Sequence, residues 1–89
     1  MNKSFELGQM VITSNASSIL SNEDIQKAIA RHSNCDWGDL EEEDREVNNQ
    51  ALKDGDRLFS AYHDSNNVKF WIITEADRSV TTVLMPEDY

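Results

Sequence analysis

The last quarter of the chain places the tightest constraint on its fold. Residues 68–74 (VKFWIIT) carry large apolar side chains that alternate onto both sides of an extended chain. Burial on both sides is typical of a strand inside a sheet. A polar turn at 75–78 and a second apolar run at 79–85 follow, and Pro86 ends that run. We therefore expect a β-ribbon here, around which the rest of the chain is organised.

The preceding segments predict two helices and two further strands. Ser21 can cap a helix, and apolar residues then recur at three- and four-residue spacing as far as His32. Asp39 suits the N-cap of a second helix, which Gly55 would end in a left-handed conformation. The apolar positions of that helix form a narrow stripe of Leu40, Val47, Ala51 and Leu52. Short runs rich in apolar and β-branched residues predict strands at residues 9–13 and 57–63.

These elements predict a single α+β domain over residues 1–89, with the order β-α-α-β-β-β. The expected sheet is antiparallel and has about four strands, of which the last three form a meander. Two helices would cover one face of the sheet, and residues 1–8 would be loosely attached. If the run at 79–85 lay at a sheet edge, its unpaired backbone could support dimerisation. The oligomeric state stays open.

The formal net charge of −9, from 17 acidic and 8 basic residues, limits the classes of partner. Binding to a nucleic-acid backbone or to an anionic membrane requires clustered Lys and Arg, so neither is expected. A protein with a basic surface is the expected partner. Cys35 is the sole cysteine, and the N-terminal residues lack the apolar core of a signal peptide. We therefore expect a cytoplasmic protein.

An acidic run in the middle of the chain supplies the candidate partner-binding residues. It comprises Asp36, Asp39, Glu41, Glu42, Glu43, Asp44 and Glu46. On a helix, Glu42 and Glu46 share one face, where like charges at this spacing repel. One functional reason for such a patch is imitation of a phosphate backbone, which would let the protein occupy a nucleic-acid-binding site. The alternative is a solvated helix start, where acids suit the helix dipole.

A small endoribonuclease or toxin-like enzyme is the second hypothesis. His63, Glu75 and Arg78 could supply a base, an acid and a cation for a phosphate. Pairing of the strands at 57–63 and 68–74 would, however, separate His63 from the other two by the length of a strand. His32 and Cys35 form only half of a zinc-ligand set, and no phosphate-cradling glycine pattern is present, so neither a metal nor a cofactor is expected.

Three motifs resemble those of a group of short acidic bacterial proteins carried on plasmids and other mobile elements. The motifs are DWGDL (Asp36–Leu40), ITEADRS (Ile73–Ser79) and TTVLMPEDY (Thr81–Tyr89). Proteins of this group are usually labelled plasmid-related proteins or subunits of type I restriction systems. The resemblance covers residues 7–89 and implies a mobile-element context, without catalytic residues that could be carried over. Together with the charge, it favours a non-enzymatic nucleic-acid mimic that inhibits a host defence system of the restriction or CRISPR type.

Overall fold

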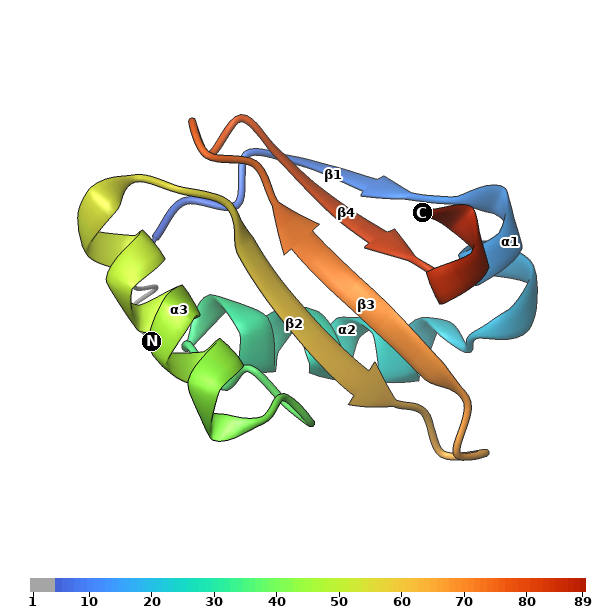
Figure 1. Ribbon diagram of the computed structural model, residues 1–89. Coiled ribbons are helices and arrows are strands. Elements are labelled where there is room, and N and C mark those ends of the chain that lie inside the picture. The colour runs from blue at the N-terminus through green and yellow to red at the C-terminus, as the bar shows by residue number, and fades with distance from the viewer. Residues whose placement is uncertain (1–4) are drawn as a thin grey trace.

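The computed structural model describes residues 5–89 and places four strands in one sheet (Figure 1). Their order across the sheet is β1-β4-β3-β2. The strands are β1 (Gln9–Ile12), β2 (Leu58–His63), β3 (Lys69–Thr74) and β4 (Val80–Leu84). The C-terminal meander and the interior position of β3 are therefore confirmed. Because β4 is interior as well, the edge position considered for residues 79–85 is wrong.

The sheet is mixed, because β1 pairs with β4 in the parallel direction, whereas the β2–β3 and β3–β4 pairs are antiparallel. The expectation of a purely antiparallel sheet is wrong at this one pair. The direction follows from the connection. The helices between β1 and β2 carry the chain back to the end of the sheet at which β1 begins, so β2 runs in the same direction as β1. The two reversals of the meander give β4 that direction again, and β1 lies beside β4.

Three helices lie between β1 and β2, which is one helix more than the sequence predicts, and a final 3-10 turn follows β4. The helices are α1 (Ser14–Ile19), α2 (Asn22–Ser33) and α3 (Glu42–Asp54), and the turn is η1 (Pro86–Asp88). The additional helix, α1, is capped by the hydroxyl of Thr13. α2 is capped as predicted by Ser21, whose hydroxyl accepts from the backbone N–H of Asp24 at 3.1 Å. α3 ends as predicted at Gly55 in the left-handed conformation.

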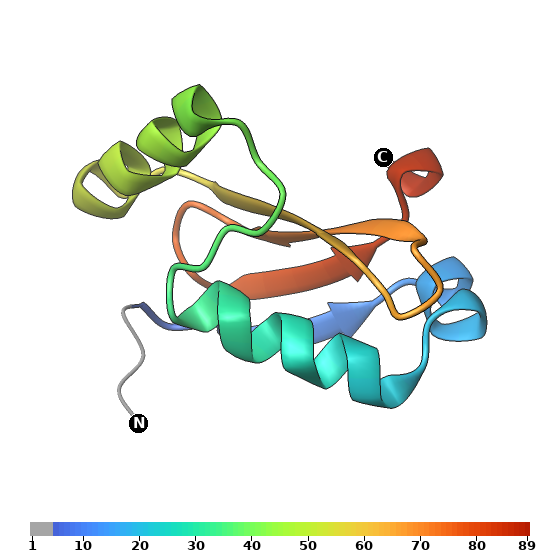
Figure 2. The same cartoon turned by 90° about the horizontal axis from the view of Figure 1, so that it is seen from below.

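α2 lies across one face of the sheet, whereas α3 lies along the outer edge of β2 (Figure 2). The expectation of two helices on one face is therefore met by α2 alone. Ile25 and Ala28 of α2 are buried in one cluster with Phe70, Ile72 and Val83 from β3 and β4. The three-residue spacing of Ile25 and Ala28 places both side chains on the face that meets the sheet.

A row of buried polar groups continues this packing along α2. The fully buried His32 ring has Nδ1 at 2.5 Å from Ser60 Oγ and Nε2 at 2.9 Å from Thr74 Oγ1. Thr74 pairs with Thr81 at 2.7 Å, and Thr81 Oγ1 donates to the carbonyl of Leu7 at 2.6 Å. A carbonyl only accepts, so Thr74 donates to Thr81 and Nε2–H donates to Thr74. Ser60 then donates to Nδ1, and His32 is held as the neutral Nε2–H tautomer.

The segment before β1 is packed against this row. The Phe5 ring centroid lies 5.3 Å from that of His32 and 6.2 Å from that of Trp37. Gly8 has a positive φ of 66°, and a Cβ there would overlap the carbonyl of Ser79. Residues 5–8 therefore lie beside His32 and the end of the β3–β4 turn, whereas the expected loose attachment of residues 1–8 stays a prediction. Residues 1–4 lie outside the described part of the chain.

Candidate functional site

α3 is held against the outer edge of β2 by hydrogen bonds to the strand backbone. The side-chain amide of Asn48 donates to Phe59 O at 2.5 Å and accepts from Phe59 N at 3.0 Å. Further along this edge, Ala61 O accepts from Asp39 N at 2.7 Å, and Ala61 N donates to Trp37 O at 3.2 Å. These contacts close the β2 edge of the sheet and fix α3 at the periphery of the molecule.

This anchoring changes which positions of α3 are buried. Val47, which the apolar stripe places inside, is 65% exposed, and Asn48 is buried in its place. The start of the helix also differs, because Glu41 is the N-cap and makes no side-chain capping hydrogen bond. The predicted N-cap, Asp39, uses its carboxylate elsewhere. α3 therefore presents an apolar side chain to solvent in addition to its acidic first turns.

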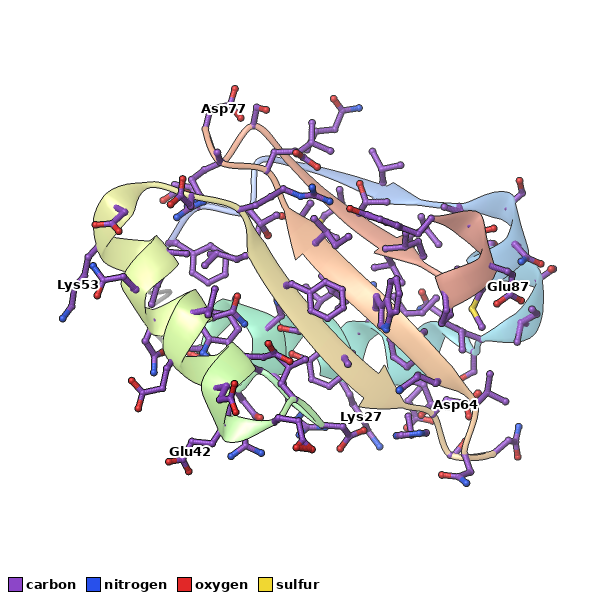
Figure 3. The ribbon with its side chains drawn as sticks, viewed as in Figure 1. Lys27, Glu42, Lys53, Asp64, Asp77 and Glu87 are labelled. Atoms are coloured by element: carbon purple, nitrogen blue, oxygen red, sulfur yellow. The ribbon has the colours of Figure 1, made fainter. Side chains whose placement is uncertain are left out.

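The acidic run divides into two groups. Asp36 accepts from Arg31 Nε at 2.8 Å and from Nη2 at 3.2 Å, and this guanidinium lowers the pKa of Asp36 below its ordinary value. Asp39 Oδ2 lies 2.5 Å from His63 Nδ1. The other five acids are exposed and make no ion pair within residues 5–89. They form what we call the acidic face of α3: Glu41, Glu42, Glu43, Asp44 and Glu46. Figure 3 shows Glu42 pointing away from the sheet.

A groove lies between α3 and the start of β2. Two cavities, of about 270 Å³ and about 480 Å³, both have Val47 and Arg57 in their linings. The smaller cavity extends to Phe59, and the larger one extends to Ala76. Carboxylates also line this groove, from Asp44, Asp54 and Asp56. The groove therefore combines apolar contact area with negative charge, next to the acidic face.

An aromatic row continues from the groove across the sheet face opposite α2. The ring centroids of Phe59 and Trp71 are 5.0 Å apart, and those of Trp71 and Tyr89 are 5.8 Å apart. The Arg57 guanidinium lies 5.6 Å from the Tyr89 ring centroid and donates to its hydroxyl at 3.1 Å. Partly exposed aromatic and arginine side chains of this kind are typical of protein-binding surfaces. The sequence alternation places Phe59 and Trp71 on this face, but no periodic signal links them to Tyr89.

The structure does not bring His63, Glu75 and Arg78 together. His63 ends β2 and pairs with Lys69, whereas Glu75 follows the other end of β3. Arg78 donates to four backbone carbonyls, those of Ala51, Asp56, Glu75 and Ala76. Arg78 thereby ties the end of α3 to the β3–β4 turn. The strand-length separation expected for His63 is confirmed, and the arrangement gives no support to catalysis by this set.

His63 belongs instead to a small cleft that the sequence does not reveal. The cavity has a volume of about 140 Å³, and its lining includes Lys27, Arg31, Tyr62 and His63. Arg31 lies 4.9 Å from the Tyr62 ring centroid, and the Tyr62 hydroxyl donates to Asp36 O at 2.6 Å. The side chains of Lys27, Arg31 and His63 each have a carboxylate partner, from Glu23, Asp36 and Asp39. The side chains that line the cleft therefore connect the loop before α3 to α2 and β2 through hydrogen bonds.

No cluster of three or more His, Cys, Asp or Glu side chains within residues 5–89 is arranged to hold a metal ion. In the same part of the chain, no helix is long and apolar enough to cross a bilayer. Comparison of the chain with protein-family models, with curated proteins and with solved structures finds no match.

Proposed function

We propose that this protein is a non-enzymatic binding protein that uses α3 to occupy a basic, nucleic-acid-binding surface on a protein partner. The observation that carries the proposal is the acidic face of α3. Its five carboxylates are exposed and make no ion pair within the described residues, so their charge is available to a partner. A helix fixed at the edge of the sheet also presents this charge on a rigid support.

The charge density of this face is close to that of duplex DNA. The five carboxylates lie within residues 41–46, which at about 1.5 Å of rise per residue span about 7.5 Å of helix axis. Arg45 lies within the same stretch and offsets one of these charges, so the net charge is −4, or one negative charge per ~1.9 Å, compared with one per ~1.7 Å along B-DNA. A basic groove that binds phosphates would therefore meet a similar local density of charge over roughly one and a half turns of helix.

The groove beside α3 supplies what charge alone does not. Electrostatic complementarity speeds association and selects partners, whereas buried apolar and aromatic anchors supply most of the affinity. Val47 and Phe59 offer such anchor positions next to the carboxylates. A segment that carries both Lys or Arg and an apolar side chain would match both features. The partner is thus a basic protein surface with at least one protruding apolar residue.

The most specific form of the proposal is inhibition of a host defence nuclease of the restriction or CRISPR type. The mobile-element resemblance of the three sequence motifs and the net charge of −9 support this form. The mechanism is occlusion, in which the acidic face competes with nucleic acid for the same cationic site. No bond is made or broken, so the inhibition should be reversible and should weaken as the salt concentration rises.

Charge reversal on α3, matched with charge reversal elsewhere, tests the proposal. Glu42→Lys with Glu46→Lys reverses two charges of the acidic face, and Glu23→Lys with Glu87→Lys reverses two exposed charges outside it. Each pair raises the net charge by four, from −9 to −5. Glu42 lies in the first turn of α3 and Glu23 in the first turn of α2, so each pair places a lysine at the start of an α-helix. The control pair also places a lysine in η1 and breaks the exposed Lys27–Glu23 contact of 3.9 Å.

The assay is capture from a bacterial lysate at low and at moderate salt, followed by displacement of labelled duplex DNA from each purified captured protein. The wild type and the Glu23/Glu87 variant should capture the same protein and displace DNA from it. The Glu42/Glu46 variant should lose both activities. Equal capture and equal DNA displacement by all three proteins would refute the role of α3. Capture without DNA displacement would refute the mimicry while leaving a binding function.

A further inference from the structure

We infer that the free edge of β1 is a homodimerisation surface, at which a second copy of this chain pairs in the antiparallel direction and extends the sheet from four strands to eight. The inference goes beyond the proposed function, because it uses neither α3 nor the groove beside it. It rests on three observations: the β2 edge of the sheet is covered whereas the β1 edge is open, the backbone groups of Met10 and Ile12 point outward, and the sequence around β1 is uncharged.

The two edges of the sheet differ in their protection. The β2 edge is closed by Asn48 and by the 37–39 loop, which pair with the strand backbone. Within residues 5–89 the β1 edge has no such cover, and Figure 1 shows no other described element beyond it. Soluble proteins usually blunt an open edge with lysine, proline or a bulge. β1 has none of these, and its Met10, Val11 and Ile12 are 37%, 38% and 37% exposed.

The register with β4 determines which backbone groups point outward. Gln9 N donates to Ser79 O at 2.9 Å, and Thr13 N donates to Val83 O at 3.0 Å. Odd-numbered residues of β1 therefore direct their N–H and C=O groups toward β4. Met10 and Ile12 direct theirs away from the sheet. No hydrogen bond from the described residues reaches these four groups, so they are available to another strand.

A second copy satisfies these groups in one register. In an antiparallel pair, Met10 meets Ile12 of the other copy and Ile12 meets Met10, which forms four hydrogen bonds. Val11 then lies on the two-fold axis, opposite its own copy in a pair without backbone hydrogen bonds. The neighbouring registers would require Gly8, which has a positive φ, or Ser14, which is in α1. Only the first register keeps both hydrogen-bonded pairs, and the central Val11 pair, within β1.

The charge distribution permits this contact although the chain is strongly acidic. Residues 7–22 contain no Asp, Glu, Lys or Arg, in a sequence that is 28% charged. This is the longest uncharged stretch of the chain, and β1 lies within it. The carboxylate of Asp88 contacts the end of this stretch, where it accepts from the Thr13 hydroxyl at 2.7 Å. In the proposed register, Thr13 faces Gln9 of the other copy. The neutral amide of Gln9, and not a second carboxylate, then lies opposite the Thr13–Asp88 contact.

Cysteine substitution in β1 tests the register. In a Cys35→Ser background, Val11→Cys places two sulfurs across the axis at a Cα separation of about 4.5 Å, which suits a disulfide. Gln9→Cys is the matched control on the same face of the same strand. Its two copies would be separated by four residues, or about 13 Å. Under mild oxidation, Val11→Cys should form a covalent dimer at least about tenfold faster than Gln9→Cys.

Sedimentation of the unmodified protein tests the same dimer without cysteine chemistry. The wild type should show a concentration-dependent monomer–dimer equilibrium. Met10→Pro removes an outward N–H that the monomer does not use, so the variant should fold normally and sediment as a monomer. A wild type that remains monomeric at all concentrations, or equal cross-linking of Val11→Cys and Gln9→Cys, would overturn the inference. If Met10→Pro did not fold, the cross-linking rates would decide.

Discussion

Acidification should destabilise this protein through the buried ring of His32. Burial lowers the pKa of His32 to about 4, from an ordinary value of 6.5. The hydrogen bonds act in the same sense, because Ser60 donates to Nδ1 and would have to rotate away before a second N–H could form there. The native state therefore holds a neutral ring at a pH where an unfolded chain already carries a charged one.

The direction and size of the effect follow from proton linkage. Between pH 6.5 and about 4 the unfolded state binds more protons than the native state, so the free energy of unfolding falls as the pH falls. At ~1.4 kcal/mol per pKa unit, the full loss is about 3 kcal/mol. Asp24, Asp36, Asp77 and Asp88 have pKa values lowered from 3.8, so their contributions are lost only at more acidic pH. The intermediate window thus reports on His32.

Urea unfolding, followed by tryptophan fluorescence at neutral pH and near pH 4.5, measures this loss, which should be about 2.5 kcal/mol at the lower pH. His63→Gln is the matched control, because it keeps the buried ring and should retain the loss. His32→Gln should abolish the dependence, and NMR titration of the His32 ring in the wild type gives the same answer directly. A ring that titrates near 6.5, or equal stability at the two pH values, would refute the reasoning.

Two further predictions concern the attachment of α3. Asn48→Ala removes both hydrogen bonds to the Phe59 backbone and should lower the free energy of unfolding by about 2 kcal/mol. Amide exchange in α3 should become faster in the same variant, and unchanged exchange would contradict the role of Asn48 in holding α3 against β2. Gly38→Ala should severely impair folding, since its Cβ would overlap the carbonyl oxygen of Ala61. Gly55 has a similar positive φ with open space around it, so Gly55→Ala should cost only about 1 kcal/mol, and equal thermal melting of the two variants would refute the steric argument.

The sequence predicts which helices and strands form better than it predicts which strands pair with each other. Periodicity identifies α2, the meander and the interior position of β3, because each depends on local spacing. The parallel pairing of β1 with β4 depends on where the helical connection returns the chain, and no local pattern records that. For the short α1, the sequence indicates either a single helical turn or a lead-in at residues 17–20, because its capping residue, Thr13, lies within the run that reads as a strand.

The candidate site shows the same limit in α3. Its sequence allows two buried faces, one through Val47 and Ala51 and one through Asn48 and Ala51. Hydrophobicity favours the first, but the exposed backbone of β2 needs hydrogen-bond partners, and the Asn48 amide supplies both a donor and an acceptor. The sheet edge therefore selects the polar residue. A similar competition explains Asp39, whose carboxylate pairs with His63 and leaves Glu41 as the N-cap.

If both proposals hold, the dimer carries two acidic faces and can bind a partner at two sites. α3 lies beyond β2, and the proposed dimer contact lies at β1, on the opposite edge of the sheet. In an eight-stranded sheet with about 4.8 Å between strands, the two β2 strands are about 34 Å apart, and the two acidic faces lie farther apart still. A two-fold symmetric partner could then bind both faces, with a gain in avidity of about 10²-fold or more. Met10→Pro should remove this gain while leaving single-site affinity unchanged, whereas Glu42→Lys with Glu46→Lys should remove both. Dissociation rates that differ between wild type and Met10→Pro only on densely immobilised partner would distinguish avidity from a loss of the binding site.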